Sequence, residues 1–165
     1  MLIGVLSDSH GRADTTALAV RALLEEGAEL LLHLGDVGSE RVIDELARGP
    51  ARLVFGNCDL GLERLRRHAE AVGVGCDHPL GLLEADRRRI AYTHGHLAGA
   101  MKAALSGGAD YLLHGHTHAV RDERLGLTRV LNPGALHRAA RYTCLLLDPS
   151  GDAARWLEVA RESHG

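Results

Sequence analysis

Histidine and carboxylate residues gather at a few places in this sequence. Five of the eleven histidines fall between residues 94 and 118, where an even distribution would place roughly 1.7. They are His94, His96, His114, His116 and His118. Earlier in the chain stand Asp8, His10, Asp36 and Asn57. Imidazole nitrogens together with carboxylate and amide oxygens are ligands of first-row divalent metal ions, so these residues predict a metal centre.

The spacing of these residues favours shared ligation. Asp8 and His10 are separated by one residue, and so are His116 and His118. Where a strand ends, side chains at positions i and i+2 point the same way and can bind one ion. Asp36 has two carboxylate oxygens and can therefore bridge two ions. Two cations roughly 3.5–4 Å apart can activate a bridging hydroxide and clamp a phosphoryl oxygen.

The first half of the chain predicts the elements that hold these side chains. Apolar runs at 2–6, 30–34 and 52–55 each end in polar residues, and helical patterns lie between them. Such repeated strand, loop and helix units form an α/β sheet, which binds ligands beyond the carboxyl ends of its strands. The polar residues lie at that edge each time.

The second half changes its pattern. One helix is expected at residues 97–105, and turn residues separate the short apolar segments 80–83, 89–93, 111–113, 130–131, 142–147 and 155–159. We expect these segments to form a second, largely antiparallel sheet packed on the first. Residues 1–165 would then form a single domain, a length sufficient for its own core.

The motifs occur in an order that resembles a known family. They are Asp8-x-His10, Gly35-Asp36, Gly56-Asn57-Cys58-Asp59, Thr93-His94-Gly95-His96 and Gly115-His116-Thr117-His118. This set resembles the calcineurin-like metallophosphoesterase superfamily, in particular its small single-domain phosphodiesterases. The resemblance implies an α/β fold of two packed sheets flanked by helices, in four layers α/β/β/α. It extends from residue 1 to about residue 147.

The resemblance also implies a ligand set. One ion would be bound by Asp8, His10, Asp36 and His118, and the other by Asp36, Asn57, His94 and His116. Phosphodiester hydrolysis would then proceed by in-line attack of a hydroxide that bridges the ions. Asp36, Asn57, His94 and His116 are expected to be catalytic, with His94 and His116 holding phosphoryl oxygens. Manganese is the first expectation for the metal, although nickel, iron or zinc fits the same ligands.

Three further residues are candidate substrate contacts: Arg12, Cys58 and His96. Arg12 follows the first motif and could bind a phosphate, or it is a solvated loop residue. Cys58 stands where many family members have a histidine that protonates the leaving group. Its side chain either fills space under the site or contacts the substrate. Because a neutral thiol is a poor proton donor, activated or diester substrates would be favoured. His96, like His114, either orients a neighbouring ligand or points away from it.

The composition also bears on the location of the protein and on its expected partners. No apolar run approaches the roughly 18 residues of a membrane span, and the first apolar run already turns polar at Ser7, so we expect a cytoplasmic protein without membrane contact. Eighteen scattered arginines, one lysine and 3% aromatic residues do not favour nucleic-acid binding. The expected partner is a small phosphoester, and a homo-oligomer is compatible with the sequence. The alternative is a non-catalytic, protein-binding scaffold of the same fold, similar to the retromer subunit.

Overall fold

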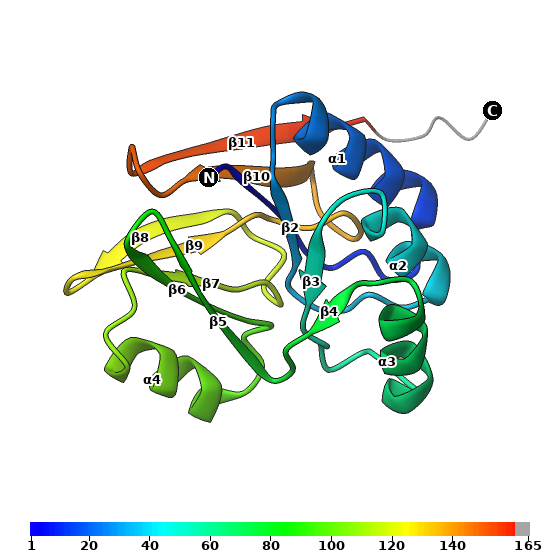
Figure 1. Ribbon diagram of the computed structural model, residues 1–165, viewed down its shortest axis with the longest axis horizontal. Coiled ribbons are helices and arrows are strands. Elements are labelled where there is room, and N and C mark those ends of the chain that lie inside the picture. Colours follow the sequence, from blue (N-terminus) through cyan, green and yellow to red (C-terminus); the bar gives the residue numbers. More distant parts are fainter. Residues whose placement is uncertain (161–165) are drawn as a thin grey trace.

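The first sheet is built around the N-terminal strand. The computed structural model describes residues 1–160, and in it the sheet has six strands (Figure 1). Their order is β11 (Ala153–Val159), β10 (Tyr142–Asp148), β1 (Ile3–Leu6), β2 (Leu30–His33), β3 (Ala51–Leu53) and β4 (Gly75–Cys76). β1 to β4 run parallel, whereas β10 is antiparallel to β1. The carboxyl ends of β1, β2 and β3 therefore meet at one edge.

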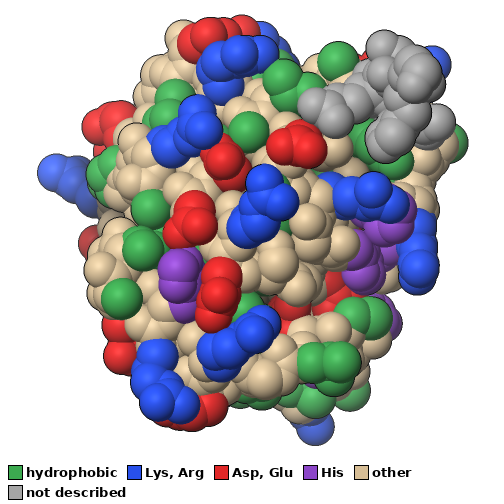
Figure 2. Space-filling view, turned by 90° about the vertical axis from the view of Figure 1, so that its right-hand side faces the viewer, with side chains coloured by type: hydrophobic (Ala, Val, Ile, Leu, Met, Phe, Trp, Pro, Cys, Tyr) green, Lys and Arg blue, Asp and Glu red, His purple; other side chains and the backbone are tan. Residues whose placement is uncertain are grey.

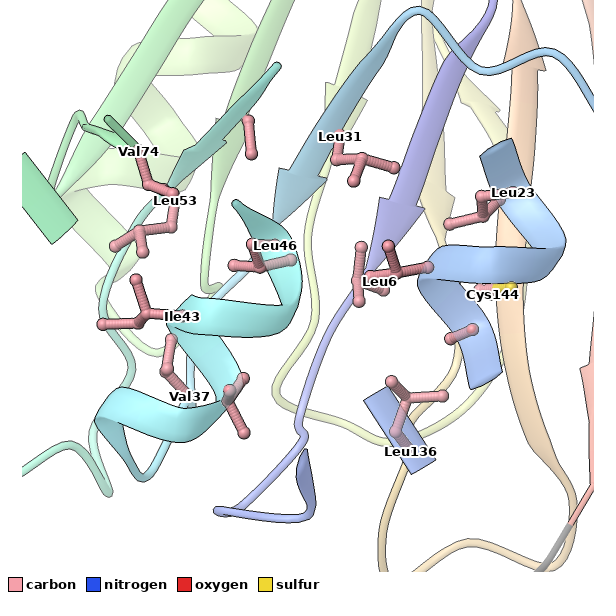
Figure 3. Packing of buried hydrophobic residues seen from close by; sticks show 14 of the residues in the cluster. Leu6, Leu23, Leu31, Val37, Ile43, Leu46, Leu53, Val74, Leu136 and Cys144 are labelled. Carbon is pink, nitrogen blue, oxygen red and sulfur yellow. The ribbon is translucent and has the colours of Figure 1, made fainter. Parts of the chain in front are cut away.

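Three helices cover the outer face of this sheet (Figure 1). They are α1 (Ala13–Glu25), α2 (Glu40–Leu46) and α3 (Leu62–Ala71). Apolar side chains of the helices, such as Leu23 and Ile43, pack on Leu6 and Leu31 of the strands (Figure 3). A Cβ at Gly4 would lie 3.0 Å from the Leu23 side chain of α1, so this glycine lets α1 approach β1 closely.

A second sheet of five strands packs on the inner face of the first. Its order is β5 (Leu80–Ala85), β6 (Arg88–Thr93), β7 (Tyr111–Leu113), β9 (Thr128–Asn132) and β8 (Arg121–Leu125). Ile3 and Val5 of β1 face this sheet and are fully buried against residues such as Tyr92 and Leu113. β1 is thus buried on both faces, which explains why 2–6 is continuously apolar.

One helix covers the outer face of the second sheet. α4 (Ala98–Ser106) packs on β6, β7 and β9 through Ala104, Ala91, Leu112 and Val130. The layers are therefore helices, sheet, sheet and helix, as the resemblance predicted. Within residues 1–160, no helix is long and apolar enough to cross a membrane.

Two expectations about the second half were wrong, and one strand was not expected. The segments at 142–147 and 155–159 form β10 and β11, which extend the first sheet rather than the second. The second sheet is mixed, because β7 lies parallel to both β6 and β9. β8 has no apolar periodicity; its residues are mostly exposed, since it is an edge strand held by pairing with β9. Asp86 and Arg87 form the tight turn between β5 and β6.

Candidate metal centre

The backbone is strained where the loops leave the strands. Within residues 1–160, nine non-glycine residues have a positive φ, and five of them are predicted metal ligands. These five are Asp8, His10, Asp36, His116 and His118. A left-handed backbone is unfavourable for residues with a Cβ and persists only where the surroundings impose it. The strain is therefore concentrated at the edge where the two sheets meet.

Four of the predicted ligands converge on one point. Single ligand atoms of Asp8, His10, Asp36 and His118 all lie within 4.8 Å of one another. His118 Nε2 is 3.2 Å from Asp8 Oδ1 and 3.3 Å from His10 Nε2. His10 Nε2 is in turn 3.5 Å from Asp36 Oδ2. The two carboxylates are buried and the two imidazoles are partly exposed, so the group opens to solvent on one side.

A second group shares Asp36 with the first. His94 Nε2 lies 3.4 Å from Asp36 Oδ2 and 3.1 Å from Asn57 Oδ1. The His116 ring centroid is 5.1 Å from that of His94, and His116 is exposed. Asp36 Oδ2 therefore lies between the two groups, while its Oδ1 accepts a hydrogen bond from the Cys58 N–H at 2.8 Å.

Hydrogen bonds at the outer ring nitrogens fix which nitrogen faces inward. His94 Nδ1 lies 2.7 Å from the Leu34 carbonyl and His118 Nδ1 lies 3.2 Å from the Arg138 carbonyl, so in each ring Nδ1–H donates. In a neutral ring, Nε2 then presents a lone pair to the centre. Asp8 Oδ1 is buried and has no hydrogen-bond partner in the part of the chain that the structure describes. Lone pairs that face lone pairs need a cation between them, so these residues fit divalent metal ions.

The charges of the groups support the same arrangement. Burial alone would raise the pKa of Asp36, but hydrogen bonds from His94 and the Cys58 N–H hold that pKa well below its usual range. Burial also lowers the pKa of His10 and outweighs the nearby carboxylates. Burial opposes a charge on His94 as well, yet Asp36 and Asp8 outweigh it and raise its pKa. A cation is therefore favoured beside Asp36.

The predicted substrate contacts lie on different sides of this centre. Arg12 and Cys58, both exposed, line a hollow of about 630 Å³ together with His10. Burial and the neighbouring Asp36 raise the pKa of the Cys58 thiol, so it stays neutral at pH 7. His96 lies apart from them, its ring centroid 5.3 Å from that of His94. Its Nδ1 is buried without a hydrogen-bond partner.

Other polar residues support the loops. Ser7 donates a hydrogen bond to Asp8 Oδ2 at 2.6 Å. Asn132 donates to the Gly115 carbonyl at 3.0 Å and so braces the loop that carries His116 and His118. Neither role follows from the sequence, although Ser7 is the first polar residue after an apolar strand. His114 Nε2 lies 3.2 Å from Arg121, outside both ligand groups.

Comparison with known proteins agrees with this geometry. Residues 1–152 match the sequence model of the calcineurin-like phosphoesterase superfamily domain. The chain belongs to this superfamily. The probable metallophosphoesterase YsnB of Bacillus subtilis is 30% identical over 97% of this chain and 92% of its own length. A phosphodiesterase of Methanocaldococcus jannaschii is 28% identical over 81% of this chain and 83% of its own. Such relatives make this a hydrolase family that uses divalent metal ions.

Solved structures of the superfamily have the same fold. An archaeal phosphodiesterase superposes with a TM-score of 0.87, at 26% identity over 96% of this chain and 100% of its own. Vps29 of Entamoeba histolytica superposes with a TM-score of 0.62, at 16% identity over 97% of this chain and 100% of its own. The identity to Vps29 is low enough that the likeness extends to the fold alone.

Proposed function

We propose that this protein is a metal-dependent phosphoesterase that binds two divalent ions and hydrolyses phosphodiesters. One observation carries the proposal: Asp36 Oδ2 lies 3.5 Å from His10 Nε2 and 3.4 Å from His94 Nε2, between two groups of inward-facing ligand atoms. A carboxylate oxygen in that position suits the ligand that two ions share.

Eight ligand positions would be filled by seven residues. Asp8, His10, Asp36 and His118 would hold one ion, and Asp36, Asn57, His94 and His116 the other. Manganese suits this nitrogen and oxygen set, which contains no thiolate. Bound ions would lower the pKa of a coordinated water and stabilise charge on the phosphoryl oxygens.

Near neutral pH, the protonation states and the fixed orientations of several proposed ligands suit metal binding. Asp36 is ionised because its pKa is low, and His10 is neutral because burial lowers its pKa. Both are therefore in the protonation state that a metal ligand needs. The outer hydrogen bonds from His94 and His118 prevent their rings from turning, so the ligand atoms are held before an ion binds.

The preference for diesters rests on Cys58. This exposed residue adjoins Asp36 at the mouth, and its thiol is neutral. A neutral thiol transfers a proton poorly to a departing alkoxide. The enzyme would therefore favour substrates whose leaving group needs little protonation, such as aryl diesters.

Hydrolysis of bis-p-nitrophenyl phosphate tests the proposal. The purified protein would be assayed with added Mn²⁺ and with a chelator, and its metal content would be measured by elemental analysis. We expect turnover that depends on Mn²⁺ and stops with the chelator. A folded protein without bound metal and without turnover would refute the proposal and would leave the non-catalytic scaffold as the better explanation.

A further inference from the structure

The hollow beside the metal centre has a cationic lining. Its volume is about 630 Å³, and its side chains are His10, Arg12, Cys58, His137 and Arg138, with two glycines between them. No carboxylate is among the described residues that line it. A water molecule occupies roughly 30 Å³, so the hollow has room for a much larger group.

The two arginines of the hollow differ from most other arginines of residues 1–160 in their contacts. Ten other arginines within residues 1–160 form ion pairs with carboxylates. In the same part of the chain, the guanidinium groups of Arg12 and Arg138 have neither an ion pair nor a hydrogen bond, and both residues are exposed. Their charges are therefore available to a ligand. Histidines gather beside Lys or Arg side chains at the right-hand edge of Figure 2.

The hollow is fixed relative to the metal centre. The ring of His137 lies 5.7 Å from that of His10, measured between centroids. The carbonyl of Arg138 accepts the hydrogen bond from His118 Nδ1, and Arg138 itself has a φ of 52°. The loop that carries His137 and Arg138 is thus tied to two predicted ligands of the same ion.

Arg12 and Arg138 both lie on the side of the centre that includes His10. After burial, the charge of Arg12 contributes most to lowering the pKa of His137. On the other side, burial and then the neighbouring His94 and His116 lower the pKa of His96. A substrate whose second phosphate entered the hollow would give Arg12 and Arg138 an anionic partner.

We propose that the hollow between Arg12 and Arg138 binds a second phosphate group of the substrate, separate from the phosphate that is cleaved. This inference rests on the proposed function, because it takes the phosphate that is cleaved to lie at the metal centre. Guanidinium groups suit this role, since they donate paired hydrogen bonds to phosphate oxygens. The substrate class is accordingly a phosphodiester that carries an additional phosphate.

A matched pair of phosphonates tests this site by calorimetry. The Mn²⁺-loaded protein would be titrated with propylphosphonate, which has one anionic group, and with 1,3-propanediphosphonate, which has two. We expect the diphosphonate to bind about tenfold more tightly to the wild type. The double variant Arg12→Met and Arg138→Met should lose this advantage. Arg21→Met, which removes one positive charge from an exposed position on α1, should keep it.

Two results would overturn the inference: equal affinities of the wild type for both phosphonates, or an advantage that survives the loss of both arginines. Turnover of bis-p-nitrophenyl phosphate in the same samples reports separately on the proposed function. Turnover without a diphosphonate advantage would reject the second phosphate site alone. A diphosphonate advantage without turnover would reject catalysis alone.

Discussion

Two polar clusters in this molecule contain similar groups but differ in how those groups are satisfied. The first is the candidate metal centre. The second, here called the Asp77 cluster, consists of Arg52, Asp77 and Tyr92. In the Asp77 cluster every carboxylate oxygen meets a donor. Arg52 Nη2 donates to Asp77 Oδ1, while Arg52 Nε, at 2.6 Å, and the Tyr92 hydroxyl donate to Asp77 Oδ2. This cluster is complete without any ligand.

In the metal centre, by contrast, a buried acceptor has no donor. Among the described residues, Asp8 Oδ1 is buried without a hydrogen-bond partner, and His10 Nε2 lies 3.3 Å from His118 Nε2. Such an arrangement costs folding energy unless a cation enters it. The count of donors against acceptors, more than the residue types, therefore distinguishes a binding site from a structural network.

The largest effect is expected from removing the shared carboxylate. Asp36→Asn keeps an oxygen for the Cys58 N–H but loses the negative charge between the two ligand groups. Turnover of bis-p-nitrophenyl phosphate should fall by at least about a thousandfold, because metal ions contribute several kcal/mol of transition-state stabilisation. A variant with near-normal activity would show that Asp36 is not the shared ligand.

The matched change in the Asp77 cluster should affect stability instead. Asp77→Asn weakens the hydrogen bonds to Arg52 and Tyr92, which should cost about 2 kcal/mol of unfolding free energy and lower the Tm by roughly 4–8 °C. Thermal unfolding measures the loss, and kcat should stay within about twofold of the wild type. Loss of turnover in a folded Asp77→Asn protein would contradict the distinction between the clusters.

A smaller effect is expected at Cys58, an exposed residue beside Asp36. Cys58→His would place a better proton donor next to Asp36, so monoester turnover should rise about tenfold relative to diester turnover. The two rates are compared with p-nitrophenyl phosphate and bis-p-nitrophenyl phosphate. An unchanged ratio would mean that residue 58 does not reach the leaving group.

The smallest effect concerns pH. Burial would raise the pKa of Asp77, but Arg52 and Tyr92 outweigh it and lower that pKa. A lowered pKa stabilises the folded state above the ordinary Asp pKa of about 3.9, and this contribution is lost as pH falls further. The Tm difference between wild type and Asp77→Asn should therefore narrow below about pH 4. A difference independent of pH would show that the Asp77 charge is not what stabilises the cluster.

The sequence predicted the architecture well where local pattern determines it. Apolar runs before Asp8 and Asp36 identified strands of the first sheet, and the ordered motifs indicated the four layers. The sheet to which β10 and β11 belong depends instead on long-range pairing, such as that between Ile3 and Leu147. Both sheets accept such apolar strands, so no local signal distinguishes them.

The candidate site likewise has one part that the sequence predicted and another that depends on long-range contacts. The sequence indicated which residue types follow the strands, but the positive φ values of Asp8 and His118 depend on contacts between loops. The supporting role of Asn132 depends on a hydrogen bond to Gly115, far away in the chain. The roles of Asp8, His10, Asn57 and the other proposed ligands stay predictions until a metal ion is measured.

Metal stoichiometry tests the central claim most directly. Isothermal titration of metal-free protein with Mn²⁺, checked by elemental analysis after desalting, should give two ions per chain for the wild type and a sharp loss of binding for Asp36→Asn. Asp77→Asn, as the matched control, should still bind two. Fewer than two ions in the folded wild type, or two in Asp36→Asn with unchanged affinity, would contradict an assembly of two ligand groups that share Asp36.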